Sequence, residues 1–275
     1  MDRIIEKIKE RGYPVIADVD GEDTIVVFGV GYTPFLYLED EFEIGAFYPA
    51  SHEAYLFSKS LADGESVIAN PKCDYKKIAE KQGLGVRGAN DLIFTPEYGS
   101  LLSLGAVRLK NVKMKISREV EPLGCEKCGI CTKLCPAYAL NGGFNYDKCL
   151  RRQMDDGIED WAQPMLNKSV LGCNICSEFC VKNLKDRVRP PEIMQKILKI
   201  DEFFERALSG RRALEELGDI IGRNMIRPGR MLTLATYALK DLDEKYLHWL
   251  DKLYLYDDVR VKRAVEYVKS LKKDK

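Results

Sequence analysis

The sequence predicts an α+β fold built from three consecutive parts. Runs of β-branched residues alternate with helical patterns up to residue 110, eight of the nine cysteines lie between residues 125 and 180, and the pattern after Pro190 and Pro191 is helical. We therefore expect three domains, at residues 1–120, 121–190 and 191–275. The 275 residues, 45% of them hydrophobic, can bury one large core or two modest ones.

The first part is expected to fold as an α/β unit. Residues 1–12 place Ile4, Ile5 and Ile8 on one side of a short helix, and Thr24–Val30 is rich in β-branched residues, which favour a strand. Glycines and prolines then mark turns over about twenty residues. The remaining expected elements are helices at 51–61 and 75–81 and strands at 92–95 and 101–110.

The third part is expected to be helical throughout. In its last helix, Val261, Val265 and Val268 recur at helical spacing and define an apolar face, which we assign to a core. The expected helices are 193–208, 211–221, 231–239, 244–254 and 259–271.

Composition and charge exclude several classes of protein. The 43 basic and 43 acidic side chains cancel, so net charge gives no general attraction to nucleic acid or anionic lipid. The apolar runs are far shorter than the roughly 20 residues of a membrane-spanning helix, and no basic head precedes an apolar stretch at the N-terminus. We therefore expect a cytoplasmic protein without a membrane partner. The two histidines leave little for haem or His-rich zinc sites.

The cysteines follow a spacing typical of iron-sulfur proteins. Cys125, Cys128, Cys131 and Cys135 form the run C-x2-C-x2-C-x3-C, and Pro136 comes next. This is the run found in ferredoxins, where three thiolates bind one 4Fe-4S cluster and the fourth reaches a second cluster. A second set of cysteines is therefore expected. It is present as Cys173, Cys176 and Cys180, with Cys149 between the two motifs.

Counting the iron corners predicts two groups of four cysteines. The first group consists of Cys125, Cys128, Cys131 and Cys180. The second group consists of Cys135, Cys149, Cys173 and Cys176. With every iron bound by a thiolate, both clusters would relay electrons rather than bind a substrate. A pair of four-cysteine zinc sites is the alternative, and the triple spacing with its following proline favours iron.

Two features lie outside the cysteine motifs. Cys73, the ninth cysteine, is expected to be a buried or incidental thiol. Gly83, Gly85 and Gly88 satisfy G-x-G-x-x-G, but they follow a helical stretch and precede a strand, which is not the order of a dinucleotide site. We expect these glycines to let the main chain approach some other flat or anionic ligand.

Several of these segments together carry a resemblance to a known family. The segment 78–88 (IAEKQGLGVRG) runs into 92–100 (LIFTPEYGS), and both cysteine motifs follow; Glu202-Phe203 and Arg223-Asn224 lie in the closing helices. In these segments the chain resembles the epoxyqueuosine reductases and, more distantly, the iron-sulfur corrinoid reductive dehalogenases. It departs from them in a shorter segment between residues 32 and 72, and in Val-Lys-Asn after Cys180 where the family favours a proline and an aromatic residue.

The resemblance implies an architecture and a cofactor. It implies a nitroreductase- or reductive-dehalogenase-like α/β domain, a bis-4Fe-4S ferredoxin-like module and a C-terminal α-helical HEAT-like region. It also implies a cobalamin beside one cluster, in the α/β domain. The residues expected near the corrin are Gly83, Gly85, Gly88, Tyr98, Gly99 and Ser100.

The leading functional hypothesis is therefore an iron-sulfur oxidoreductase. It would take electrons from a low-potential donor of ferredoxin or flavodoxin type and pass them through two 4Fe-4S clusters to a corrinoid or a corrinoid protein. The first alternative is an electron carrier without cobalamin. The second is an epoxyqueuosine reductase that acts on tRNA.

Side chains for RNA contact and for proton transfer are less well defined. Phosphate contacts would come from the arginines of the helical part, although interleaved acidic residues favour a solvated helix face. These arginines are Arg211, Arg212, Arg223, Arg227 and Arg230.

No catalytic acid or base is assigned, and the candidates are only those that flank the expected cofactor segment. They are Asp74, Asp91, Glu97 and Tyr98.

Overall fold

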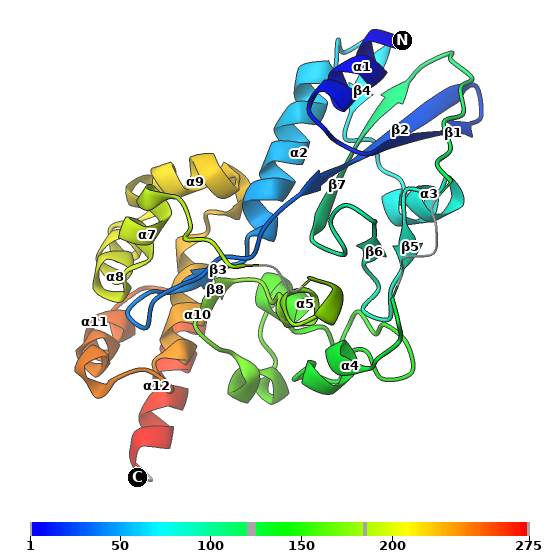
Figure 1. The fold of residues 1–275 in the computed structure, drawn as a ribbon. Helices are drawn as coiled ribbons and strands as arrows, with labels where there is room; N and C mark the ends of the chain where they lie inside the picture. The colour runs from blue at the N-terminus through cyan, green and yellow to red at the C-terminus, as the bar shows by residue number, and fades with distance from the viewer. Residues whose placement is uncertain (1, 120–124, 184–185, 274–275) are drawn as a thin grey trace.

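An antiparallel sheet forms the centre of the N-terminal part. The computed structural model describes residues 2–119, 125–183 and 186–273 (Figure 1). Its main sheet has the strand order β1-β2-β7-β4, and every neighbouring pair is antiparallel. The expected α/β unit is therefore a mixed helix and sheet fold without parallel pairing in this sheet. The strands are β1 (Val15–Asp20), β2 (Asp23–Gly31), β4 (Val67–Ala69) and β7 (Leu102–Leu109).

Helices cover both faces of this sheet. On one face, Val26 and Phe28 of β2 pack with α1 (Asp2–Glu10) and α2 (Phe47–Leu61). On the other face, Ile25 and Val27 pack beside α3 (Tyr75–Lys81), as Figure 1 shows. Because alternate residues of a strand point to opposite faces, burial on both sides explains why β2 reads as a continuous apolar run.

The cysteine-rich part consists of short elements. β8 (Ser169–Leu171) pairs in parallel with β3 (Glu43–Ile44), and β5 (Val86–Arg87) forms a hairpin with β6 (Ile93–Phe94) close to the cysteine loops. The helices are α4 (Ile130–Leu134), α5 (Leu150–Asp156), η1 (Asp160–Met165), α6 (Ile175–Glu178) and η2 (Val181–Asn183).

The C-terminal part is helical, as expected. The expected helix 193–208 is interrupted at Lys199, whose backbone is extended (φ −56°, ψ 134°) because it forms a bridge with Glu41. The elements are α7 (Glu192–Leu198), α8 (Ile200–Ser209), η3 (Arg211–Leu214), α9 (Glu215–Ile221), η4 (Arg223–Met225), α10 (Pro228–Ala238), η5 (Glu244–His248), α11 (Trp249–Tyr254) and α12 (Val259–Lys273). Across the described parts of the chain, every helix is too short or too polar to traverse a lipid bilayer.

One segment of the N-terminal part packs in the helical core. The Phe42 ring lies 5.0 Å from that of Phe203 and 5.4 Å from that of Phe204. The Phe42 N–H donates to the Leu198 carbonyl at 2.7 Å, and the Ile200 N–H donates to the Asp40 carbonyl at 2.9 Å. The division at residues 120 and 190 remains a prediction, and the segment 34–44 belongs by packing to the third part.

Candidate iron-sulfur centre

The two cysteine motifs lie on helices that pack against each other. Gly129 has a left-handed backbone (φ 77°), which starts α4 and places Cys131 in its first turn. Cys135 ends the same helix, where its N–H donates to the Cys131 carbonyl at 3.1 Å. Cys176 lies on α6, which contacts α4. Cys149 precedes the first residue of α5.

The eight motif cysteines gather as two sets of four. The Cys180 thiol interacts electrostatically with three thiols of the first motif. These are Cys131, Cys125 and Cys128. The Cys176 thiol has a different set of neighbours, of which Cys131 is the weakest. The stronger ones are Cys173, Cys149 and Cys135. These neighbours are consistent with the ligand assignment, which, with the crossing of Cys135 to the second set, stays a prediction.

The chemistry of the thiols fits a cationic iron centre. Burial, with a smaller contribution from neighbouring thiols, raises the pKa of the Cys173 thiol to about 11 and that of the Cys176 thiol to about 12. Packing such thiolates together in a buried place requires a positive group between them. In a cuboidal cluster each thiolate binds a different iron. Within the described ranges, no three His, Cys, Asp or Glu side chains converge on one ion position, and a cluster does not need them to.

Backbone N–H groups point at two of the sulfur atoms. The Cys125 sulfur accepts hydrogen bonds from the N–H groups of Ala89 and Lys127, both at 3.4 Å. The Cys135 sulfur accepts one from Ala139 at 3.3 Å. Hydrogen bonds to ligand sulfurs are one determinant of a cluster's reduction potential. Ala89 belongs to the β5–β6 hairpin, so the N-terminal part contributes directly to the surroundings of the first group.

Asn183 joins the cysteine module to the N-terminal part. Its side chain is 1% exposed; its Oδ1 accepts the Ser100 N–H at 2.9 Å, and its Nδ2 donates to the Ser100 hydroxyl at 2.6 Å and to the Ser177 carbonyl at 2.7 Å. A Cβ atom on Gly99, which has φ +57°, would lie 2.2 Å from the Asn183 Oδ1. In the sequence, Asn183 is only a departure from the family pattern. In the structure, its hydrogen bonds hold the cysteine module against the N-terminal part.

We expect the substitution Asn183→Ala to destabilise the protein by about 2 kcal/mol, because the Ser100 N–H, the Ser100 hydroxyl and the Ser177 carbonyl lose their hydrogen bonds to Asn183. Urea unfolding, followed by circular dichroism, measures this change. Asn141→Ala, at an exposed position of the same module, is the control and should unfold like the parent. Equal unfolding midpoints for the two variants would contradict this function of Asn183.

The glycines expected near a corrin face the protein's own atoms. A Cβ atom on Gly83 would lie 2.1 Å from the Arg118 carbonyl oxygen, and one on Gly85 would lie 2.1 Å from the Phe94 carbonyl oxygen. One on Gly88 would lie 2.3 Å from the Phe94 ring. These glycines therefore allow internal packing, with Gly83 (φ +71°) also ending α3.

The other three expected cofactor residues are also in internal contacts. The Tyr98 ring packs on Gly31, where a Cβ atom would lie 2.2 Å from it. Gly99 and Ser100 contact Asn183, as described above. The assignment of these six residues to a cobalamin site stays a prediction, and no step of the function below passes through that cofactor.

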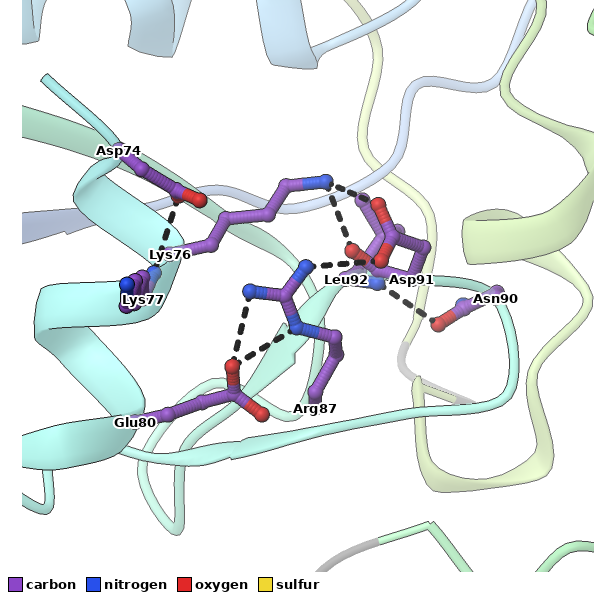
Figure 2. Close-up of polar contacts among 8 residues, drawn as sticks. All are labelled: Asp74, Lys76, Lys77, Glu80, Arg87, Asn90, Asp91 and Leu92. Atoms are coloured by element: carbon purple, nitrogen blue, oxygen red, sulfur yellow. Dashed lines mark hydrogen bonds and ion pairs between the residues drawn. The ribbon is translucent and has the colours of Figure 1, made fainter. Parts of the chain in front are cut away.

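The candidate carboxylates have structural partners. Asp74 caps α3 by accepting the Lys77 N–H at 3.0 Å. Asp91 accepts from Lys76 at 2.7 Å and from Arg87 at 2.9 Å, as Figure 2 shows. Glu97 pairs with Arg118. Their positions give no evidence for proton transfer. Cys73 is exposed rather than buried, and it lies outside both cysteine groups.

A groove of about 530 Å³ adjoins the second cysteine group. The sequence motifs do not predict this groove, because one wall is the segment 35–45. That segment carries no motif and lies near the cysteines only in the folded chain. Glu178 also lines the groove. Burial raises the pKa of its carboxyl, and Arg187 opposes that shift. The groove has aromatic, apolar and basic side chains around a cysteine. Lining residues include Phe35, Tyr37, Leu134, Cys173, Phe179 and Arg187.

Three of the five arginines considered for phosphate contact share a second groove. This groove has a volume of about 410 Å³ and is lined by Arg211, Arg212 and Arg223 together with Glu215. Arg223 pairs with Glu215 at 3.2 Å and with Asp219 at 2.9 Å, which partly neutralises the cluster. Arg230 is elsewhere and pairs with Asp155.

Comparison with known proteins finds an iron-sulfur cluster domain and relatives named as epoxyqueuosine reductases. Residues 124–183 match the family described as 4Fe-4S double cluster binding domain. The epoxyqueuosine reductase of Listeria monocytogenes is 30% identical over 178 residues, which are 59% of this chain and 45% of that protein. That of Bacillus subtilis is 28% identical over 199 residues, 66% of this chain and 50% of that protein. The chain spans about half the length of the curated relatives it matches.

Solved structures share the fold. The epoxyqueuosine reductase of Streptococcus thermophilus superposes with a TM-score of 0.74 at 17% identity, covering 99% of this chain and 90% of that one. A second structure, an epoxyqueuosine reductase with an epoxyqueuosine-modified tRNA-Tyr stem loop, gives 0.64 at 18% identity, covering 98% and 82%. At these identities the likeness concerns the fold alone. Together with the double-cluster match and the curated relatives, this likeness shows that the chain is similar to the epoxyqueuosine reductases and supports two 4Fe-4S clusters as its cofactors.

Proposed function

We propose that this chain is an iron-sulfur reductase that acts on an epoxide-bearing nucleoside of tRNA. The observation that carries the proposal is a groove lined with aromatic residues and by Cys173, one of the eight motif cysteines. The curated relatives are named for the reduction of epoxyqueuosine, and one structure of the same fold is described with a modified tRNA stem loop. These names favour RNA as substrate over the corrinoid relay of the sequence analysis.

The residues of the chain supply a binding place and an electron path. When bound, the two clusters supply electrons one at a time at low potential. Reduction of an epoxide breaks a carbon–oxygen bond and takes two electrons and two protons, so a ferredoxin- or flavodoxin-type donor must reload the chain. Phe35 and Phe179 in the 530 Å³ groove offer aromatic surface for a base, and Arg187 a charge for the ribose-phosphate backbone. The groove of Arg211, Arg212 and Arg223 offers further phosphate contacts.

The test is a reaction under anaerobic conditions with the reconstituted protein, dithionite and an epoxyqueuosine-modified tRNA stem loop. We expect mass spectrometry to show loss of the epoxide, and we expect no reaction with protein that lacks iron. Retained substrate in the presence of fully reduced clusters would favour the electron carrier. A reaction that starts only after cobalamin is added would restore the corrinoid hypothesis and overturn the direct path proposed here.

A single substitution tests whether the substrate binds in the 530 Å³ groove. Phe179→Ala should lower turnover of the stem loop by about 5- to 150-fold, because stacking of one base on an aromatic ring contributes about 1–3 kcal/mol. Phe144→Ala, at another exposed phenylalanine of the cysteine module, is the matched control. Equal turnover in the two variants, with equal iron content, would move the substrate site away from this groove.

A further inference from the structure

The residues that join β5 to β6 form a tight hairpin loop. The Asp91 N–H donates to the Gly88 carbonyl at 3.0 Å, and the Gly88 N–H donates to the Leu92 carbonyl at 2.8 Å. Asp91 has φ +61°, while Ala89 and Asn90 have negative φ. This is a type I turn followed by one left-handed residue, the usual geometry of a three-residue hairpin loop. Glycine is the common choice at the left-handed position, so an aspartate there needs a reason.

Two cations hold Asp91 in this conformation. The Lys76 ammonium donates to the Asp91 carboxylate and to its carbonyl, both at 2.7 Å. Arg87 donates to the other carboxylate oxygen at 2.9 Å and pairs with Glu80 at 2.8 Å. Figure 2 shows these side chains converging on Asp91 from α3 and β5. The loop is therefore fixed to the N-terminal part by four charged side chains.

The fixed loop contacts both cysteine groups. The Ala89 N–H donates to the Cys125 sulfur at 3.4 Å, which belongs to the first group. The Asn90 side-chain amide, 5% exposed, donates to the Cys176 carbonyl at 3.1 Å, in the second group. The same side chain accepts the Leu92 N–H at 3.2 Å, so its orientation is set by the loop itself.

We propose that the loop 88–91 is a positioning element that sets the reduction potential of the cluster bound by Cys125, Cys128, Cys131 and Cys180. Reduction adds negative charge to the cluster sulfurs, so a fixed N–H dipole aimed at a ligand sulfur stabilises the reduced form and raises the potential. The loop also fixes the second group through Asn90. The inference deepens the proposed function and rests on its ligand assignment. It gives the G-x-G-x-x-G segment a function toward the clusters instead of toward a nucleotide.

The substitution Ala89→Pro removes this N–H with little change to the loop. Proline is favoured at the second position of a type I turn, which Ala89 occupies. Ala89→Gly keeps the N–H and is the control. In the full-length holoprotein, redox titration followed by electron paramagnetic resonance should give a more negative midpoint potential for one cluster in the proline variant. The glycine variant should match the parent. In D₂O, the reduced proline variant should lose the deuteron hyperfine coupling of the Ala89 N–H and keep that of the Lys127 N–H, which donates to the same sulfur.

A second variant covers the case in which the proline variant does not incorporate iron. Asn90→Ala changes no charge and frees the loop from Cys176, so it should shift the same potential in the same direction and weaken the deuteron coupling. Parent potentials in an iron-replete Ala89→Pro protein, or parent potentials in Asn90→Ala, would overturn the inference. Neither readout depends on turnover, so a failure here leaves the reaction with tRNA intact, and an inactive parent with the expected shift overturns only the proposed substrate.

Discussion

Replacing Cys131 with alanine should remove one cluster, and replacing Cys135 should remove the other. Cys131 lies in α4 and Cys135 caps its C-terminus four positions later, yet the ligand assignment predicts them in different groups of thiols. A cluster that loses one of its four thiolates is expected to lose its iron, because the open corner is left to solvent. Each variant should therefore hold about four irons instead of about eight, and each should lose its reaction with the stem loop.

Spectroscopy shows which cluster has gone. The cluster retained in Cys131→Ala should be the one lost in Cys135→Ala, so the electron paramagnetic resonance spectra of the two reduced variants should add up to that of the parent. Cys180→Ala should match the first variant and Cys149→Ala the second. Cys73→Ala is the control and should keep all its iron, because Cys73 lies outside both groups. Identical spectra for Cys131→Ala and Cys135→Ala would refute the crossing of Cys135.

The sequence was most informative where the signal is local. The cysteine spacing identified the module because cluster ligation fixes which residues stand two and three positions apart. The helix at 75–81 is also found as predicted, since Asp74 caps it and Gly83 ends it. The strand predicted at 24–30 becomes β2 with one more residue at each end.

The misses have identifiable physical causes. β1 was not predicted because Asp18 and Asp20 interrupt its apolar pattern; in the fold, Asp18 accepts a hydrogen bond from the Gln82 amide at 2.7 Å and pairs with Lys81. The predicted start of α2 at residue 51 is four residues late because Pro49 was interpreted as a turn, although proline is tolerated in the first turn of a helix.

In the candidate site, too, the features with a local sequence signal were predicted and those that depend on distant contacts were not. Its cysteines could be predicted, whereas the groove beside them and the loop 88–91 depend on contacts between distant segments. The glycine motif suggested a ligand because glycine permits close approach, but sequence does not say what approaches. In the fold the approaching atoms belong to Arg118, Phe94 and Asn90.

The second large effect concerns a buried ion pair that holds the segment 34–44 in the helical core. The Glu41 side chain is 1% exposed, and Arg189 donates to its two oxygens at 2.8 and 2.5 Å. Arg189 also donates to the Leu36 carbonyl and to Gln195. Arg189→Met should destabilise the protein by about 3 kcal/mol at pH 7, because it leaves a buried carboxylate without its partner. This is the lower end of the range for such pairs, since Arg189 is 32% exposed and water can replace part of it.

The pH dependence separates this cause from a simple loss of packing. Burial disfavours the ionised Glu41, but Arg189, the Leu38 N–H and Lys199 together outweigh it and hold the carboxyl pKa below its usual value. The parent therefore has the full benefit of the pair above the unfolded pKa of about 4.3 and loses it as the pH falls through the lower, folded pKa. In Arg189→Met, only the hydrogen bond from the Leu38 N–H and the charge of Lys199 still oppose burial, so the pKa of Glu41 rises relative to the parent and acid relieves the penalty by protonating Glu41. The stability difference from the parent, measured by urea unfolding, should then shrink between pH 7 and pH 4. Glu41→Gln removes the titrating group, so its difference from the parent follows the parent's own titration and shrinks only as the pH falls below about 4.3. A constant difference for Arg189→Met over this range would mean that lost packing, and not the unpaired carboxylate, causes the destabilisation.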